Sequence, residues 1–196
     1  MNRKTNTAKL TYAALLTALA IILSYFPEIP LAFFAPWLKL DFSFTPLLLL
    51  GFAIGPGMAA IAIVVTNVVH IIGGTTGGVG ELANILIGLA FVMPPAFLYR
   101  KSRTWRSAIV GMVIGILLMM GASIVANRYL LLPKFLGDNF EEALNNFGMN
   151  LSSYLWGAIL PFNFIKGLLN AFLTRLLYKR LSNTIKEAEK DVAVSD

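Results

Sequence analysis

Six stretches of apolar residues divide this chain, and their lengths restrict its fold more than any other feature of the sequence. They cover residues 8–26, 44–55, 57–73, 79–99, 106–132 and 151–180, and none alternates as a half-buried strand would. A run of about 20 apolar residues can cross the core of a bilayer as a helix. The composition agrees, because 57% of the residues are hydrophobic and 13% are charged, against about 25% charged in soluble domains. The sequence therefore predicts an all-α integral membrane protein with six transmembrane helices.

The second stretch is the weakest of the six. As an α-helix, residues 45–55 would rise only about 17 Å, whereas the hydrocarbon core is about 30 Å thick. This helix must therefore start earlier, tilt, or lie where the bilayer is thinned. The alternative is that the second and third stretches form one interrupted span, or a re-entrant hairpin around Gly55-Pro56-Gly57.

The distribution of basic residues favours the six-span reading. With the N-terminus inside, the inner side receives 12 of the 16 lysines and arginines, namely Arg3, Lys4, Lys9, Arg100, Lys101, Arg103, Arg106, Arg175, Lys179, Arg180, Lys186 and Lys190. An odd number of spans would separate the 100–106 cluster from the basic N-terminus. Because cytoplasmic loops carry the excess of lysine and arginine, we expect both termini to be cytoplasmic. This topology also accounts for the net charge of +6 without nucleic-acid binding.

We expect residues 1–196 to form a single membrane-embedded domain, because little sequence separates the apolar stretches. Residues 1–9 are basic and precede an apolar run, as in a signal peptide. No clear cleavage site of small residues occurs before Pro27, and more apolar stretches follow, which favours a retained first helix. Residues 182–196 mix both charges and are expected to form a cytoplasmic tail in which the last helix frays.

Lys166 lies near the middle of the last apolar stretch, and that stretch contains no acidic residue to neutralise it. A lysine at the centre of a membrane helix costs about 2.5–3.5 kcal/mol on insertion scales. We therefore expect Lys166 to face a cavity or a partner. Asn163 and Asn170 lie three residues before it and four residues after it, which puts all three side chains on one helical face. This face predicts one polar wall of a pocket.

Other polar side chains lie toward the outer ends of the predicted helices. They are Asn67, His70, Glu81, Asn84, Asn127 and Arg128. We expect them to converge with the face around Lys166 on one outward-facing pocket. The alternative for each amide is a hydrogen bond to a neighbouring helix, and His70 is more readily explained as such an interhelical residue than as a ligand.

Two predicted outer connections have compositions suited to a binding site. The loop of residues 27–43 contains Phe33, Phe34, Trp37 and Phe42, so it can lie at the membrane interface or cover a site. The link of residues 73–81 is rich in glycine, which lets the backbone approach a ligand closely.

The first apolar stretch contains a face of small residues, with Ala14 and Ala18 one helical turn apart. Small residues at this spacing let another helix approach closely. The partner helix can belong to another protein or to this chain, and the sequence leaves both readings open.

Several features that enzymes need are missing from this sequence. It contains no cysteine, so disulfides, thiol nucleophiles and cysteine-based metal sites are excluded. We find no cluster with metal-ligand spacing, no paired carboxylates arranged for catalysis and no Walker A motif. We therefore expect a protein that is not an enzyme, holds no cofactor, and takes any energy of ATP from another subunit. A membrane-embedded enzyme acting on lipid is the disfavoured alternative.

Four segments of the chain carry a family resemblance. They are Leu38-Lys39-Leu40-Asp41-Phe42-Ser43 with Pro46, Thr75-Thr76-Gly77-Gly78-Val79-Gly80-Glu81-Leu82-Ala83-Asn84, Asn127-Arg128-Tyr129, and Pro161-Phe162-Asn163-Phe164-Ile165-Lys166-Gly167. Together they resemble the substrate-binding S components of energy-coupling factor (ECF) vitamin transporters, and within them the riboflavin-specific group. The resemblance extends over nearly the whole chain.

This resemblance implies a six-helix S-component fold in a prokaryotic cell membrane. Such a subunit would capture riboflavin, its transported substrate, on the outer face, with FMN as a further candidate ligand. It would associate with a transmembrane coupling protein and two cytoplasmic ATPase subunits. An S component for a different vitamin or small metabolite is the alternative.

The resemblance also implies roles for individual residues. Substrate binding would fall to Asn127, Asn163 and Lys166, together with Leu38, Leu40, Asp41, Phe42, Thr75, Thr76, Gly77, Gly78 and Glu81. Ala14 and Ala18 would lie on the face that meets the coupling protein. With these roles, we expect Lys166→Met to leave the fold intact and to weaken riboflavin binding by about 1.5–3 kcal/mol.

Overall fold

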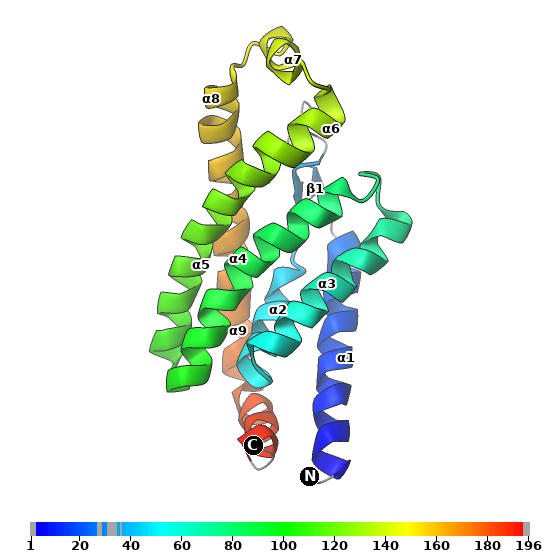
Figure 1. Ribbon diagram of the computed structural model, residues 1–196. Helices are drawn as coiled ribbons and strands as arrows, with labels where there is room; N and C mark the ends of the chain where they lie inside the picture. The colour runs from blue at the N-terminus through cyan, green and yellow to red at the C-terminus, as the bar shows by residue number, and fades with distance from the viewer. Residues whose placement is uncertain (1–2, 27–28, 31–34, 36, 194–196) are drawn as a thin grey trace.

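The computed structural model describes residues 3–26, 29–30, 35 and 37–193, and nearly all of them are helical (Figure 1). The longer helices are α1 (Arg3–Tyr25), α2 (Phe44–Ala53), α3 (Pro56–Gly73), α4 (Val79–Ser102), α5 (Trp105–Ala126) and α9 (Leu160–Ala193). The shorter helices are η1 (Asn127–Leu131), α6 (Leu132–Leu136), α7 (Phe140–Asn146), α8 (Leu151–Tyr154) and η2 (Leu155–Ile159). Two short strands, β1 (Ile29–Pro30) and β2 (Lys39–Leu40), pair antiparallel between α1 and α2. Phe33 and Phe34 of the predicted aromatic loop lie outside the described residues.

Each predicted apolar stretch corresponds to one helix or to successive helices that continue one another. The fifth stretch runs from α5 through η1 into α6, and the sixth runs from α8 through η2 into α9. Within the described part of the chain, four such runs are long and apolar enough to cross a membrane: Pro56–Gly73, Val79–Ser102, Trp105–Leu136 and Leu151–Arg180. Lys9–Tyr25 and Phe44–Ala53 are apolar but shorter. The all-α prediction is confirmed, and the count of six spans stays a prediction.

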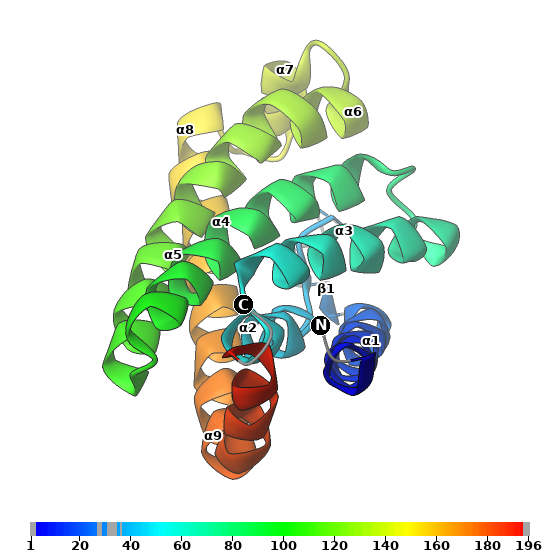
Figure 2. The ribbon, with the colours of Figure 1, turned by 60° about the horizontal axis from the view of Figure 1, so that its bottom comes forward.

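The short helix α2 lies at the centre of the bundle. Every one of its residues from Phe44 to Ala53 is buried, and α1, α3, α4 and α9 all pack against it (Figure 2). A helix that is apolar on all sides is stable only when its whole circumference is covered. This burial explains why the second stretch is apolar throughout and yet too short for an ordinary span.

The connection between α2 and α3 is a tight turn. Gly55 has a φ of 119°, a conformation that residues with a side chain rarely adopt. Pro56 then occupies the first turn of α3, where its missing N–H costs no helical hydrogen bond. The chain reverses here, so α2 and α3 are two helices rather than one continuous helix (Figure 1).

The two chain ends lie at the same end of the bundle (Figure 1). α9 continues to Ala193, so most of the predicted tail is helical rather than frayed. The rings of Phe52, Tyr99 and Tyr178 pack together near this end, with Trp105 stacked on Tyr178. The hydroxyl oxygens of Tyr99 and Tyr178 are 2.8 Å apart. Aromatic side chains therefore occupy the interior at this end of the molecule.

Helices α4 and α5 pack with their backbones close together. A Cβ atom at Gly111 would overlap the backbone of Pro95, and one at Gly115 would overlap the carbonyl oxygen of Phe91. Glycine at such contacts lets two membrane helices approach each other closely. The sequence thus permits the most extensive helix–helix contact of the bundle.

We predict that Gly115→Ala lowers the free energy of unfolding by about 1–3 kcal/mol, because the added methyl group has no space against α4. Gly121 is the matched control, since it lies on the same helix and a Cβ there would meet nothing within 4 Å. Thermal unfolding of the purified protein in detergent measures both effects. Equal melting temperatures for the two variants would contradict the close packing at Gly115.

Candidate functional site

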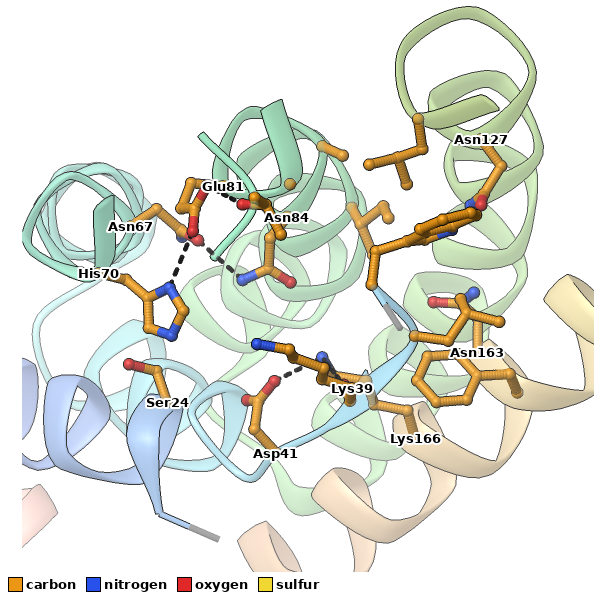
Figure 3. A pocket seen from close by; sticks show the side chains of 18 residues that line it. Ser24, Lys39, Asp41, Asn67, His70, Glu81, Asn84, Asn127, Asn163 and Lys166 are labelled. Carbon is orange, nitrogen blue, oxygen red and sulfur yellow. Dashed lines mark hydrogen bonds and ion pairs between the residues drawn. The ribbon is translucent and has the colours of Figure 1, made fainter. Parts of the chain in front are cut away.

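A pocket lies where α1 ends and β2 begins, in the half of the bundle away from the chain ends that Figure 1 marks, and Figure 3 shows it from close by. Its cavity volume is about 80 Å³, and the cavity opens into about 720 Å³ of space that includes open solvent. Its lining comes from the end of α1, from the segment around β2, and from α3, α4, η1 and α9. The lining residues are Ser24, Trp37, Leu38, Lys39, Asp41, Asn67, His70, Thr76, Gly80, Glu81, Ala83, Asn84, Ile87, Asn127, Leu131, Phe162, Asn163 and Lys166.

Lys166 is buried and forms an ion pair that spans the wall of this pocket. Its Nζ atom lies 2.6 Å from Oδ2 of Asp41 and 3.3 Å from the carbonyl oxygen of Lys39. It also lies 5.0 Å from the centre of the Phe44 ring. The neutralising carboxylate comes from the segment that precedes α2 rather than from the helix of Lys166. The costly charge predicted from the sequence is therefore paired.

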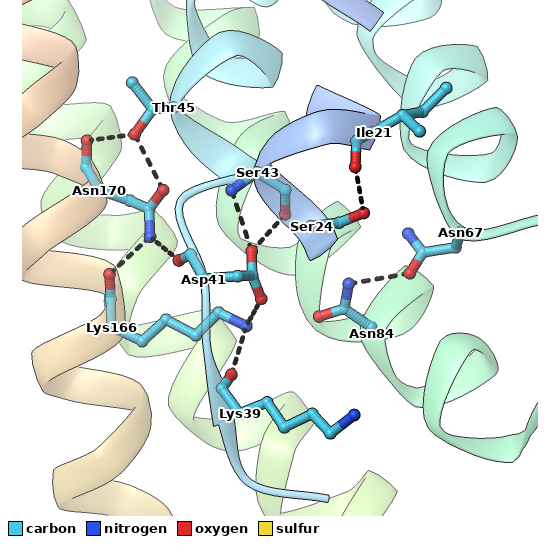
Figure 4. Close-up of polar contacts among 10 residues, drawn as sticks. All are labelled: Ile21, Ser24, Lys39, Asp41, Ser43, Thr45, Asn67, Asn84, Lys166 and Asn170. Carbon is cyan, nitrogen blue, oxygen red and sulfur yellow. Dashed lines mark hydrogen bonds and ion pairs between the residues drawn. The ribbon is translucent and has the colours of Figure 1, made fainter. Parts of the chain in front are cut away.

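A buried polar network surrounds this ion pair (Figure 4). Oδ1 of Asp41 accepts a hydrogen bond of 2.9 Å from the backbone N–H of Ser43. The amide nitrogen of Asn170 donates to the carbonyl oxygen of Asp41 at 3.1 Å and to that of Lys166 at 3.0 Å. The hydroxyl of Thr45 donates to Oδ1 of Asn170 at 2.9 Å. These contacts fasten the segment before α2 onto α9.

Asn127 begins the π-helical turn η1, and its amide is oriented by a chain of hydrogen bonds. Trp37 donates its indole N–H to the hydroxyl of Tyr154 at 3.1 Å. Because indole is only a donor, the Tyr154 hydroxyl donates in turn to Oδ1 of Asn127, at 2.9 Å. The Asn127 amide nitrogen donates to the carbonyl oxygen of Ser123 at 2.9 Å. The orientation of this buried amide is thereby determined.

Asn163 lies one turn before Lys166 on α9 and is also buried. Its amide nitrogen donates to the carbonyl oxygen of Ile159, the last residue of the π-helical turn η2, at 2.9 Å. Because this bond holds the amide nitrogen, the amide oxygen of Asn163 remains available as an acceptor. Both asparagines therefore adjoin π-helical turns, which occur frequently at functional sites.

A second polar cluster closes the opposite side of the pocket, where α1, α3 and α4 meet. His70 Nδ1 lies 3.1 Å from Oε1 of Glu81, and the Thr76 hydroxyl donates to Oε2 of the same carboxylate. The ring of Tyr25 stacks on His70 with centroids 4.5 Å apart, and its hydroxyl donates to the carbonyl oxygen of Val69 at 3.1 Å. Glu81 thus joins the end of α3 to the glycine-rich link.

Glycine is required in this link for close packing. A Cβ atom at Gly74 would overlap Glu81 Oε1 and crowd His70. A Cβ atom at Gly80 would overlap the side chain of Thr76. The glycines therefore let the link fold down onto Glu81, beside the pocket.

Two further amides lie between these clusters, on α3 and α4. Asn84 donates to Oδ1 of Asn67 at 2.8 Å, and Asn67 donates to the carbonyl oxygen of Ile63 at 2.8 Å. The bond between Asn84 and Asn67 thus joins two neighbouring helices, as the alternative expected, and both residues also line the pocket. Both predictions, a hydrogen bond between helices and a position in the pocket lining, therefore hold for this pair.

The structure brings together many of the residues predicted from the sequence. Seven of the predicted substrate-binding residues line the pocket: Leu38, Asp41, Thr76, Glu81, Asn127, Asn163 and Lys166. The others, Leu40, Phe42, Thr75, Gly77 and Gly78, are described but are not among its lining residues. The roles of all twelve residues in binding stay predictions.

Two predicted pocket residues lie elsewhere. Asn170 is completely buried behind the ion pair and does not line the pocket. Arg128 pairs instead with Glu141 at 3.0 Å and lies over the ring of Phe140. Helical spacing placed Asn170 on the correct face, but the segment before α2 covers that part of the face.

Several lining residues were not identified from the sequence. Ile87 lies three residues after Asn84, and Leu131 lies four residues after Asn127, so helical spacing from these asparagines could have indicated both. Ala83 lies only two residues after Glu81 and has no such signal. Ser24 gives no such signal either, because its hydroxyl donates to the carbonyl oxygen of Ile21 within the helix, much as Thr11 and Thr17 bond carbonyls of the same helix.

Comparisons with known proteins agree over most of the chain. A model of the family described as "ECF transporter, substrate-specific component" matches residues 8–178. The chain is 33% identical over 178 residues to the riboflavin transporter RibU of Staphylococcus aureus (strain TCH60), covering 91% of this chain and 92% of that protein. It is 30% identical over 187 residues to the riboflavin transporter FmnP of Bacillus subtilis (strain 168), covering 91% and 94%.

A solved structure is similar in both fold and sequence. It is described as "Structure and mechanism of the S component of a bacterial ECF transporter", and its TM-score with this chain is 0.75 at 31% identity. The match covers 92% of this chain and 99% of that chain. The similarity therefore extends over most of the helical arrangement.

The Lys166–Asp41 pair changes one expectation drawn from the sequence. We now predict that Lys166→Met destabilises the fold by about 3–5 kcal/mol, because it leaves the Asp41 carboxylate buried without its partner. Adding Asp41→Asn removes the unpaired charge and should restore most of the loss. Thermal unfolding in detergent, without ligand, compares the single and double variants. A Lys166→Met protein as stable as the wild type would contradict the importance of the pair.

Proposed function

We propose that this chain binds riboflavin in this pocket for uptake into the cell, because it belongs to the family of substrate-specific components of ECF transporters. The family is a component of transporters and not a class of enzymes. Relatives that share 33% and 30% of their aligned residues with this chain are riboflavin transporters. The chemistry of the pocket supports the same substrate.

One observation carries this proposal: three side chains present alternating hydrogen-bonding groups to a ligand. Asn127 uses its oxygen and one amide hydrogen on Tyr154 and Ser123, which leaves one N–H as a donor. Asn163 uses one amide hydrogen on Ile159, which leaves its oxygen as an acceptor beside a second N–H. Lys166 uses two of its three hydrogens on Lys39 and Asp41, within the described part of the chain. The third ammonium hydrogen is a second donor.

The order of these groups matches the pyrimidine edge of a flavin. Asn163 lies between Asn127 and Lys166 in Figure 3, so the row reads donor, acceptor, donor. The flavin edge presents a carbonyl, an imide N–H and a second carbonyl, which read acceptor, donor, acceptor. A complementary row leaves no buried polar group without a partner when the ligand binds.

The rest of the pocket suits the other parts of riboflavin. Ile87, Leu131, Trp37 and Phe162 supply apolar and aromatic surface for the ring system. Hydroxyl, amide and carboxylate groups lie on the far side, from Ser24, Asn67, Asn84 and Glu81. Such groups can hydrogen-bond the hydroxyls of the ribityl chain. This arrangement orients the flavin with its ring toward α9.

We propose six spans with both termini cytoplasmic. Twelve of the 16 basic residues belong to the segments at the end where both termini lie, as the positive-inside rule requires. The pocket lies in the other half of the bundle, which this orientation turns toward the outside of a prokaryotic cell. Riboflavin would then be captured from the external medium.

The delivery step would use partner subunits, a transmembrane coupling protein and two cytoplasmic ATPases. Ala14 and Ala18 are exposed on α1, whereas Ala13 and Ala20 are buried against the rest of the bundle. The face of small residues is therefore not used for packing within the described chain. It is available for a helix of the coupling protein.

We predict that the purified protein quenches the fluorescence of added riboflavin and that Asn163→Ala weakens binding by about 1–3 kcal/mol, because the imide N–H loses its acceptor. Asn145→Ala, at an exposed asparagine of α7, is the matched control. Titrations with FMN and with other vitamins compare the ligands. A wild-type protein that prefers another vitamin would contradict the riboflavin assignment, and unchanged affinity of Asn163→Ala would contradict only the imide contact.

We predict that Ala14→Leu leaves riboflavin binding by the isolated subunit unchanged and reduces uptake by cells about tenfold or more, because the larger side chain blocks close helix approach. Gly121→Leu is the control, because it enlarges an exposed glycine on α5 with open space around it. Uptake of labelled riboflavin measures both variants. Normal uptake by Ala14→Leu would exclude this face from coupling.

A further inference from the structure

Asn170 is a polar residue that takes no part in the proposed flavin contacts. Its side chain is completely buried, and it does not line the pocket. We propose that Asn170 is a positioning residue, which holds Lys166 and Asp41 in the geometry that reads the flavin edge. This inference rests on the proposed binding of riboflavin in the pocket.

The amide of Asn170 connects three separate parts of the chain. Its nitrogen donates to the carbonyl oxygen of Asp41 at 3.1 Å and to that of Lys166 at 3.0 Å. Its oxygen accepts from the hydroxyl of Thr45 on α2 at 2.9 Å. The same side chain therefore joins α9, α2 and the segment that carries Asp41 (Figure 4).

These bonds determine where the carboxylate of Asp41 lies. Its backbone carbonyl is held by Asn170, and its Oδ1 atom accepts from the backbone N–H of Ser43 at 2.9 Å. Oδ2 then points at Lys166, 2.6 Å from Nζ. The ammonium group is limited to one position by Asp41 on one side and the ring of Phe44 on another.

The third ammonium hydrogen depends on this arrangement. Two hydrogens are directed at Oδ2 of Asp41 and at the carbonyl oxygen of Lys39. Tetrahedral geometry at the nitrogen then sets the direction of the remaining one. If the segment before α2 shifts, the direction of the donor shifts with it, and a buried hydrogen bond weakens steeply with misalignment.

A purely structural role for Asn170 would have a different consequence. Removing the amide would then lower the free energy of unfolding without a specific effect on the hydrogen bond from Lys166 to the ligand. Any change in riboflavin affinity would be the same with and without Lys166. The two roles are separated by a double-mutant cycle, because coupled residues show non-additive effects and independent residues show additive ones.

The experiment is a riboflavin titration of Asn170→Leu, which has a similar volume and no polar atoms. We expect its Kd to rise roughly tenfold. In a background of Lys166→Met with Asp41→Asn, the same change should alter Kd by less than about twofold. The matched control is Thr174→Val, which removes a buried hydroxyl on the same helix that bonds the Asn170 carbonyl at 2.7 Å without contacting the ion pair. Its Kd should stay within about twofold of the wild type.

A second pair of variants covers the case in which Asn170→Leu does not fold. Thr45→Val removes the hydroxyl that orients the Asn170 amide and should raise Kd roughly threefold, whereas Thr45→Ser keeps the hydroxyl and should restore wild-type binding. The inference is overturned if wild-type protein binds riboflavin and Asn170→Leu, or Thr45→Val in its place, binds it equally well. Equal losses with and without Lys166 would also overturn it. A wild-type protein that binds no riboflavin would instead overturn the proposed function, and this inference with it.

Discussion

The ion pair between Lys166 and Asp41 is the interaction on which the binding site depends. It neutralises a lysine in the middle of the last helix, and its 2.6 Å contact ties that helix to the segment before α2. A buried pair of this kind is stable only when the remaining polar groups also find partners. Ser43, Thr45 and Asn170 supply those partners. The pocket wall, the buried helix α2 and the central charge are therefore one connected unit.

The opposite side of the pocket is supported by a second polar cluster. There Glu81 joins His70 and Thr76, and glycines at positions 74 and 80 let the link approach closely. The link also meets the segment before α2, because Nζ of Lys39 donates to the hydroxyl of Thr75 at 3.3 Å. In the proposed binding mode, one side offers fixed donors and an acceptor to a flat ring edge, and the other offers several polar groups to a flexible chain of hydroxyls.

Much of the helical architecture could be predicted from hydropathy, because helices buried in lipid or protein must be apolar over most of their surface. The predicted stretches correspond to α1, α2, α3, α4, and the continuous runs that contain α5 and α9. Helical spacing also placed Asn163 and Lys166 on one wall of the pocket. The same spacing wrongly assigned Asn170 to the pocket, because spacing shows which residues share a face and not what covers that face.

The sequence by itself determined that the chain is an all-helical membrane protein with a costly charge and a set of amides toward one end. Only the tertiary structure decided which partners those groups have. Asp41 lies 125 residues before Lys166 in the chain, and Tyr154 reaches Asn127 across 27 residues. Local periodicity carries no information about such contacts, because they arise when separate helices pack. For the same reason, the sequence showed an unpaired lysine where the folded protein holds a paired and oriented donor.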